Sequence, residues 1–270
     1  MDLNTITEVL RPASADAVKK WPSGHAWLAG GTWLFSEPQV TTNTLVDLEA
    51  FKWPSLGILP DGLEIAATCK VAELDRLTAP PQWKAAPLFS ECCRAFLASF
   101  KIWNEATVGG NIVMSLPAGP MISLTAALEG VCTLWPRNGL PREVRMIDFV
   151  TGDHENILAP GELLRSIFLP ASALKKRYVF RRFSLTHLGR SEVLLIGTLV
   201  RGDFVLTVTA STLRPVQLRF ENVPPAEELK GKLDQAIPFD LYLDDPHGSP
   251  PHRQHLTYYF AEQIRQSLTA

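Results

Sequence analysis

Two pairs of adjacent glycines, each placed after an apolar stretch, constrain the fold of this chain more than any other feature. They lie in Ala29-Gly30-Gly31-Thr32 and in Thr107-Val108-Gly109-Gly110-Asn111. Glycine lets the backbone take positive φ angles and come close to a ligand, and successive N–H groups in such a turn form an anion-binding concavity. Thr32, Thr107 and Asn111 add polar side chains. The sequence therefore predicts two loops that can grip a pyrophosphate from both sides without a lysine.

Neither glycine pair belongs to a common nucleotide-binding motif. A P-loop has the form G-x-x-x-x-G-K-[ST], and the usual dinucleotide-binding turn has the form G-x-G-x-x-G. Neither pattern occurs at the two loops. A single Gly-Gly pair is more often an ordinary turn, so only the combination of the two loops with their surroundings indicates a binding site.

Composition indicates a protein with a real core and no strong charge bias. Of the 270 residues, 46% are hydrophobic and 20% are charged, and the net charge is −2. This length suits one large domain or two smaller ones, and the charge does not favour a nucleic-acid partner. The longest apolar run, residues 193–200, is far too short to span a membrane. Because the first ten residues also lack a signal-peptide pattern, we expect a cytoplasmic protein.

The cysteines show no metal-binding pattern. Cys69, Cys92, Cys93 and Cys132 contain no C-x-x-C pair, and no Cys/His cluster has zinc or iron–sulfur spacing. We interpret them as free thiols in or near a helix that packs on the core. The sequence also shows no catalytic triad. We therefore expect no metal site and no catalytic acid or base, with the chemistry supplied by a bound cofactor.

The secondary-structure pattern changes near residue 171. Before it, strands are expected at 25–29, 44–48, 56–59, 63–67, 131–134 and 144–147, and helices at 83–100 and 121–129. After it, strands are expected at 177–183, 193–200, 204–209 and 216–220, followed by helices at 226–233 and 252–268. We place a domain boundary there, giving domains 1–171 and 172–270.

With their surroundings, the two loops resemble the FAD loops of one flavoprotein family. Leu28-Ala29-Gly30-Gly31-Thr32 is similar to the first FAD loop of the flavin subunits of molybdopterin dehydrogenases. Residues 102–112, IWNEATVGGNI, are similar to the second loop, whose usual form is IRNxATIGGNI. Weaker similarities lie at 45–48, 64–68, 160–164, 214–216 and 247–253. The likeness extends over residues 5 to 268, with both loops in the order and at the separation that the family uses.

This resemblance implies an α+β fold. Subdomains of about 1–55 and 56–171 would form a two-subdomain FAD-binding clamp of the oxidase/dehydrogenase flavoprotein type. Residues 172–270 would form a C-terminal α+β domain with an antiparallel sheet and helices.

The resemblance also implies a function. The chain would be the FAD-binding electron-transfer subunit of a molybdenum hydroxylase, an oxidoreductase of the xanthine dehydrogenase and carbon monoxide dehydrogenase type. It would form a hetero-oligomer with an iron–sulfur subunit and a molybdenum cofactor subunit. Electrons would pass from the iron–sulfur clusters to FAD and on to NAD, oxygen, a quinone or another acceptor. The substrate stays open, because the molybdenum subunit selects it.

Roles for the loop residues follow from the same likeness. The backbone from Leu28 to Trp33 would cradle the pyrophosphate. Thr107, Gly110 and Asn111 would contact the phosphates and the ribitol from the second loop.

Apolar residues and one cation complete the expected site. Ile102 and Leu164 would lie near the flavin or adenine ring. Arg182 takes the place of a family lysine near the ring system, where a cation can stabilise negative charge on reduced flavin; the alternative is a solvated charge at a strand edge. The expected cofactor-binding residues are Leu28, Ala29, Gly30, Gly31, Thr32, Trp33, Ile102, Thr107, Gly109, Gly110, Asn111, Leu116, Leu164 and Arg182.

The sequence departs from the family pattern around these loops. Trp33 stands where an acid often follows AGGT, and residues 116–120 stand where Ser-Pro-x-x-Asp is usual, so that Pro120 replaces an acid expected near the adenosine. Arg190-Ser191-Glu192 stands where Asp-Ile-Ala is usual. Losing a carboxylate that accepts a ribose hydroxyl costs about 1.5–3 kcal/mol, or ~10–100-fold in affinity. Backbone contacts to the pyrophosphate do not depend on these side chains, so FAD is still expected.

Two other functions stay open. A stand-alone FAD oxidoreductase of the related oxidase type often attaches FAD to a histidine after the first glycine pair, where this chain has Thr32. Such a protein would also need a large substrate domain, which the chain lacks. The departures at Trp33, Leu116 and Pro120 are typical of the other alternative, a subunit that has lost FAD and serves as a scaffold or assembly partner.

Overall fold

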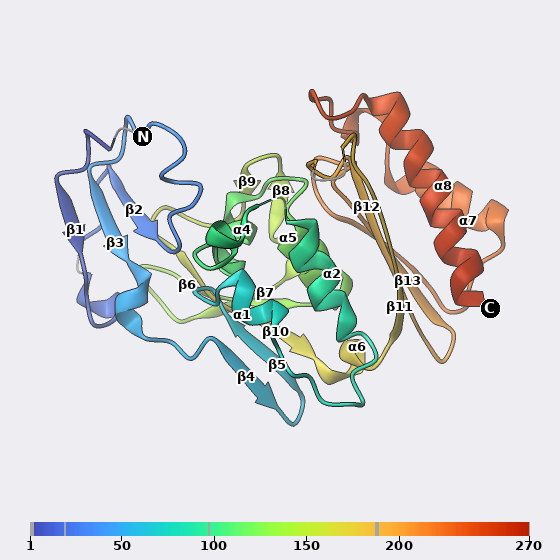
Figure 1. Cartoon of the computed structure of the whole chain (residues 1–270), viewed down its shortest axis with the longest axis horizontal. Helices are drawn as coiled ribbons and strands as arrows, with labels where there is room; N and C mark the ends of the chain where they lie inside the picture. Colours follow the sequence, from blue (N-terminus) through green and yellow to red (C-terminus); the bar gives the residue numbers. More distant parts are fainter. Residues whose placement is uncertain (1–2, 19, 97, 187–188, 270) are drawn as a thin grey trace.

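Three main β-sheets follow one another along the chain, and each lies in a different part of the molecule (Figure 1). The computed structural model describes residues 3–18, 20–96, 98–186 and 189–269. The sheets lie within residues 8–47, 56–170 and 177–220. Each sheet therefore falls inside one of the segments expected from the sequence, although the division into independent domains stays a prediction.

The first sheet is small and parallel. Its strands are β1 (Glu8–Leu10), β2 (His25–Leu28) and β3 (Thr44–Asp47), in the order β1-β3-β2. Strand β3 pairs in parallel with both neighbours and buries Leu45 and Val46. Short 3-10 helices lie at Ala15–Ala17 and Leu48–Phe51. Because β2 ends at Leu28, the first glycine loop leaves the sheet directly at its edge.

The second sheet is antiparallel and carries most of the core. Its strands are β4 (Leu56–Leu59), β5 (Gly62–Ala66), β6 (Val131–Trp135), β7 (Arg142–Arg145) and β10 (Leu163–Pro170), in the order β4-β5-β10-β6-β7. Its associated helices are α1 (Val71–Asp75), α2 (Pro87–Ala95), α3 (Phe100–Trp103), α4 (Val108–Met114) and α5 (Pro120–Ala127). A 3-10 helix (Met146–Asp148) and a small ribbon of β8 (Val150–Gly152) and β9 (Glu155–Asn156) complete this part. The expected hairpin around Asp61-Gly62 is confirmed as β4–β5.

The expected residue ranges of one helix and one strand in this part are wrong. The single helix expected over 83–100 is two separate helices, because α2 begins at Pro87, which suits a first turn, and ends before Phe96, which has extended dihedrals. The strand expected at 144–147 lies at Arg142–Arg145, and its last residues form the 3-10 helix instead. Cys92 and Cys93 are buried in α2, and burial raises the pKa of Cys93 to about 12.

The third sheet agrees closely with the sequence prediction. Its antiparallel strands are β11 (Arg177–Phe183), β12 (Val193–Val200), β13 (Asp203–Thr209) and β14 (Val216–Phe220), in chain order. Around them are α6 (Ala171–Leu174), α7 (Ala226–Ala236), a 3-10 helix (Phe239–Leu241) and α8 (Pro250–Thr269). The expected α+β class and C-terminal antiparallel sheet are thus confirmed.

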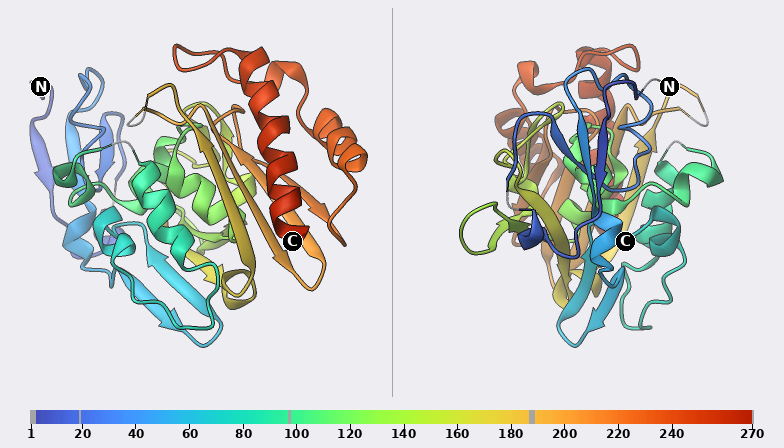
Figure 2. Two further views of the ribbon diagram at one scale, coloured as in Figure 1. Left: turned by 45° about the vertical axis from the view of Figure 1, so that its right-hand side comes forward. Right: turned by 90° about the vertical axis from the view of Figure 1, so that its left-hand side faces the viewer.

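Helices cover both faces of this third sheet. Helix α8 lies along its outer face, while α2 and α5 pack on the inner face (Figures 1 and 2). Gly197 permits the close approach of α8, since a Cβ there would lie 2.2 Å from Ile264 Cγ2. The inner helices thereby join the third sheet to the core of the second part.

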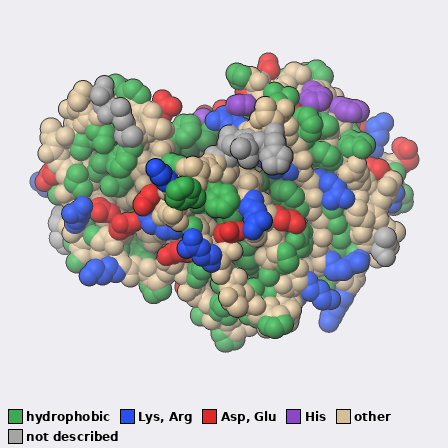
Figure 3. All heavy atoms as spheres, in the orientation of Figure 1, with side chains coloured by type: hydrophobic (Ala, Val, Ile, Leu, Met, Phe, Trp, Pro, Cys, Tyr) green, Lys and Arg blue, Asp and Glu red, His purple; other side chains and the backbone are tan. Residues whose placement is uncertain are grey.

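Charged side chains of both signs occur on the face of the molecule that Figure 3 draws. On the face drawn in Figure 3, the basic and acidic side chains are interspersed. Within the described ranges, no helix combines the length and apolarity needed to cross a membrane.

Candidate functional site

A cavity of about 610 Å³ lies where the three parts of the chain meet. Its wall takes Leu28 and Thr32 from the first part, Thr107 and Asn111 from the second, and Arg190 from the third. Cavities of ~300–1,000 Å³ with mainly apolar walls are typical of small-molecule and cofactor sites. The fold thus forms one site from segments far apart in sequence.

The structure brings nearly all of the expected site residues together at this cavity. Those that line it are Leu28, Ala29, Gly30, Gly31, Thr32, Trp33, Ile102, Thr107, Gly109, Gly110, Asn111, Leu116 and Leu164. Arg182 is not among the lining residues. The individual contacts of these residues with a cofactor stay predictions.

The first glycine loop leaves backbone donors unused. After β2, Gly30 packs so tightly that a Cβ on it would lie 1.8 Å from the carbonyl oxygen of Glu105, at the start of the second loop. Gly31 has φ +68°, a left-handed conformation that favours glycine. Within the described residues, the N–H groups of Gly31, Thr32 and Trp33 have no acceptor. These free amides fit the anion-binding turn expected from the sequence.

The second glycine loop is the N-terminus of α4, and its amides are already occupied. Thr107 Oγ1 accepts a 3.0 Å hydrogen bond from Gly110 N, and Thr107 O accepts one from Asn111 N. Gly109 N donates to Ala67 O at 2.9 Å, and a Cβ on Gly109 would lie 2.4 Å from Ala67 Cβ. The expectation of an anion-binding nest of free amides here is therefore wrong, because capping and close packing use these groups.

Side chains supply the donors of the second loop instead. Asn111 Oδ1 accepts a 3.1 Å hydrogen bond from Met121 N, which fixes the amide and leaves its Nδ2 available to donate. The Thr107 hydroxyl accepts from the backbone and keeps its own proton for another acceptor. Both side chains line the cavity. The two loops together offer backbone and side-chain donors to one ligand.

Comparison with known proteins identifies this arrangement. The family described as the FAD binding domain in molybdopterin dehydrogenase matches residues 6–172. The chain belongs to this family. FAD is therefore the cofactor of this flavin domain, and the resemblance expected from the sequence is confirmed.

Curated relatives resemble this flavin domain over part of their length. Xanthine dehydrogenase 1 of Arabidopsis thaliana is 27% identical over 122 residues, which cover 43% of this chain and 9% of the plant protein. The carbon monoxide dehydrogenase medium chain of Hydrogenophaga pseudoflava is 27% identical over 151 residues, which cover 56% of this chain and 50% of that protein. The matched segments thus span half or less of these relatives.

Solved structures show the same fold over nearly the whole chain. Quinoline 2-oxidoreductase from Pseudomonas putida 86 matches with a TM-score of 0.80 at 20% identity, covering 99% of this chain and 98% of its own. Carbon monoxide dehydrogenase from Hydrogenophaga pseudoflava matches with a TM-score of 0.79 at 18% identity, covering 96% of both chains. These likenesses extend to the third sheet, beyond the segment that the family model matches.

Three residues that depart from the family pattern lie in the wall of this cavity. Trp33, Leu116 and Pro120 all line it, and Pro120 is buried at the first position of α5. The Trp33 ring centroid lies 5.9 Å from that of His154. The flavin domain therefore presents apolar side chains at these three positions of the wall.

One acidic residue of the cavity wall was not among the expected site residues. Glu162 is 4% exposed and makes two 2.7 Å hydrogen bonds with Arg142, which hold the pKa of Glu162 below its ordinary value. It also accepts from Ala159 N. The Pro-Gly-Glu segment of the resemblance indicated this region, but it did not mark Glu162 as a residue of the cavity wall.

Arg182 contacts a turn next to the cavity. It donates to Ser191 Oγ at 2.7 Å and to the carbonyl oxygen of Gly189, and burial lowers its pKa. It is therefore neither a lining residue nor a solvated charge at a strand edge. The lining residues of this turn are Arg190 and Ser191, which the sequence marked only as a departure.

Proposed function

We propose that this chain is the FAD-binding electron-transfer subunit of a molybdenum hydroxylase, an oxidoreductase complex. It receives electrons from the iron–sulfur clusters of a partner subunit and passes them through FAD to NAD or another acceptor. A molybdenum cofactor subunit completes the hetero-oligomer. The observation that supports this proposal is the meeting of both glycine loops on one cavity in a chain of this family. The cytoplasmic location is part of the same proposal.

The first loop holds the pyrophosphate in this proposal. The unused N–H groups of Gly31, Thr32 and Trp33 supply hydrogen-bond donors without a cationic side chain. Gly30 holds this loop against the carbonyl of Glu105, so the donors keep their position before FAD binds. A preformed donor set reduces the ordering cost of binding.

The second loop and the apolar wall orient the rest of the cofactor. The Thr107 hydroxyl and Asn111 Nδ2 donate to phosphate or ribitol oxygens. Ile102, Leu116 and Leu164 give the rings an apolar surface that excludes water. When bound, FAD supplies the redox chemistry, and the protein sets its position and surroundings.

The apolar departures weaken the adenosine end of this site. Pro120 cannot accept a hydrogen bond from a ribose hydroxyl through its side chain, whereas an acid could. The missing charge-assisted hydrogen bond corresponds to about 1.5–3 kcal/mol. We therefore expect FAD that dissociates on dilution rather than FAD that survives every purification step.

The absorbance spectrum of the purified chain, followed by identification of the released cofactor, tests this proposal. Visible flavin bands and released FAD support the flavin subunit. Copurification with an iron–sulfur and a molybdenum subunit, and bleaching of the flavin only in that complex, support the electron-transfer role.

A second candidate function follows from the apolar departures themselves. If the chain is colourless, does not take up added FAD and still copurifies with such partners, the scaffold function replaces the flavin function. Trp33, Leu116 and Pro120 would then be the substitutions that removed the cofactor site. Bleaching of flavin in the isolated chain by a small substrate would instead indicate a stand-alone oxidoreductase.

A further inference from the structure

The wall of the cavity contains one charged residue for which the described part of the chain provides no partner. Among the described residues, the charged side chains of the wall are Glu162 and Arg190. Glu162 is neutralised by its two hydrogen bonds with Arg142. Arg190 has no hydrogen-bond or ion-pair partner within the part of the chain that the structure describes. Arg190 is therefore the one charged residue of the wall that has no partner among the described residues.

The turn that bears Arg190 is held from its β11 side. Arg182 donates to Ser191 Oγ at 2.7 Å and to the carbonyl oxygen of Gly189, on either side of Arg190. One residue further on, Glu192 N donates to Phe183 O at 2.9 Å. The guanidinium of Arg182 thus positions this turn and does not itself reach the cavity.

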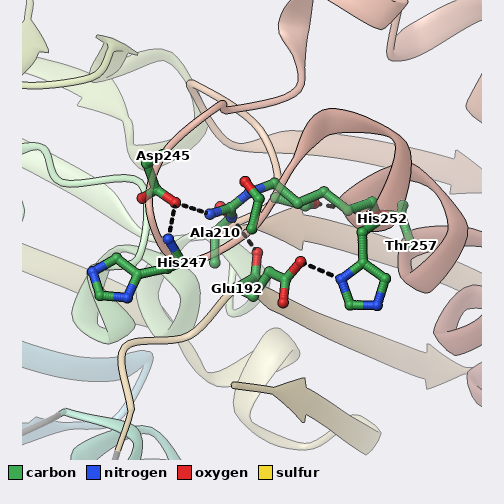
Figure 4. Close-up of polar contacts among 9 residues, drawn as sticks. Glu192, Ala210, Asp245, His247, His252 and Thr257 are labelled. Carbon is green, nitrogen blue, oxygen red and sulfur yellow. Dashed lines mark hydrogen bonds and ion pairs between the residues drawn. The ribbon is translucent and has the colours of Figure 1, made fainter. Parts of the chain in front are cut away.

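The turn is also held from the α8 side, as Figure 4 shows. Arg253 is fully buried and donates to the carbonyl oxygens of Glu192 and Ala210 and to the carboxylate of Asp245. The Glu192 side chain is buried as well, and its Oε1 lies 2.6 Å from His252 Nδ1. These buried contacts fix the backbone at the point where it leaves the cavity wall.

Close packing makes this second anchor rigid. A Cβ on Gly248 would lie 2.1 Å from Glu192 Oε1, and Arg253 Nε donates to Gly248 O at 3.0 Å. Interiors packed to this density do not shift freely. These contacts hold the backbone on both sides of Arg190, so the point from which its side chain starts does not depend on a partner of its own.

We propose that Arg190 pairs with a negatively charged group of FAD bound in this cavity, an inference that rests on the proposed function. A cation without a partner at an apolar wall is unfavourable, and an anionic ligand removes this cost. FAD has two groups that can supply the negative charge. One is the pyrophosphate, and the other is the ring system, which gains negative charge on reduction. The role expected for Arg182 thereby passes to Arg190, and Arg182 is a positioning residue.

The test compares R190Q with the wild-type chain, with R190K and with R94Q. R190K keeps the charge, while Arg94 is an exposed residue of α2 outside the cavity wall, so R94Q controls for loss of a surface arginine. Fluorescence titrations give the affinities for FAD, ADP and riboflavin. Spectroelectrochemistry gives the midpoint potential of the bound flavin. Circular dichroism shows whether each variant is folded.

Either source of the anion gives a distinct result. If Arg190 pairs with the pyrophosphate, R190Q weakens FAD and ADP binding ~10–100-fold and leaves riboflavin binding unchanged. If it pairs with the reduced ring, oxidised FAD binds as before, while a tenfold weaker hold on the two-electron-reduced form lowers the potential by about 30 mV. In both cases R190K, which keeps the charge, stays close to the wild-type affinities and potential, and R94Q matches the wild-type chain.

The inference and the proposed function fail separately. A wild-type chain that does not bind FAD overturns the proposed function. A wild-type chain that binds FAD, with a folded R190Q that matches it in all three affinities and in potential, overturns the role of Arg190 alone. If R190Q does not fold, R190M replaces it in the same measurements. Weaker FAD binding or a lower potential of R190M supports the role, and a folded R190M that matches the wild-type chain in both overturns it.

Discussion

The two glycine loops have nearly the same sequence texture, yet the structure uses their glycines in different ways. In the first loop, glycine frees the backbone: the N–H groups of residues 31–33 have no acceptor among the described residues. In the second, glycine lets a helix begin against its neighbours: Gly109 packs on Ala67, and Thr107 caps Gly110 N. The difference arises because an α-helix follows directly on the second pair. A Gly-Gly pair thus indicates that another group comes close to the backbone. The element that follows the pair decides whether this group is a ligand or another part of the protein.

The largest expected effect is that of Gly30→Ala. The new Cβ would lie 1.8 Å from the backbone oxygen of Glu105, so one of the two loops must move. Overpacking of this kind costs ~1–3 kcal/mol, and up to about 100-fold in FAD affinity if the donors shift. FAD titration and thermal unfolding measure both quantities.

A matched glycine controls for the substitution itself. Gly231 lies inside α7, and a Cβ there meets nothing within 4 Å. Gly231→Ala should stabilise the protein by about 0.5–1 kcal/mol and leave FAD binding unchanged. If the G30A and G231A variants bind FAD with equal affinity, contact between the two loops does not position the backbone donors.

Asn111→Asp separates the two functions of one side chain in the second loop. The aspartate keeps the oxygen that accepts from Met121 N but loses the Nδ2 donor. It also adds a negative charge where the proposed function places the phosphates of FAD. We expect FAD affinity to fall ~10–100-fold while the unfolding temperature of the flavin-free chain hardly changes. Equal losses in stability and affinity would instead mean that Asn111 is only a packing residue.

Thr107→Val gives the smallest effect and probes the cap. The valine removes the acceptor for Gly110 N and the hydroxyl donor together. Loss of such a cap costs ~0.5–2 kcal/mol of stability, so chemical denaturation should show a lower midpoint, with a modest fall in FAD affinity. Thr107→Ser keeps the hydroxyl and serves as the control. If the valine and serine variants unfold alike, the cap does not stabilise the second loop.

Local sequence signals predicted much of this fold. The third sheet follows from apolar runs such as 193–200 and 204–209, which are separated by a short turn and form an antiparallel pair. The hairpin β4–β5 follows from Asp61-Gly62 between apolar segments. Both glycine loops reach the cavity because each is joined to an element whose position the core fixes. The first loop directly follows β2, and the second forms the start of α4.

Long-range contacts account for what the sequence did not predict. The central strand β10 (Leu163–Pro170) was not expected, because Arg165 interrupts its apolar run and Pro170 ends it, and only its pairing with β5 and β6 reveals it. The occupied amide of Gly109 depends on the carbonyl oxygen of Ala67, which lies far earlier in the chain. The place of Arg182 likewise depends on a turn that returns beside its own strand.

Hydrogen–deuterium exchange of the chain with and without FAD tests the contrast between the loops most directly. The amides of residues 31–33 should exchange rapidly in the flavin-free chain and become strongly protected on binding, since the described residues offer them no acceptor and the proposed site gives them the pyrophosphate. The amides of residues 109–111 should be protected in both states, because the protein already occupies them. Protection gained at residues 109–111 with none gained at residues 31–33 would contradict this account of the site.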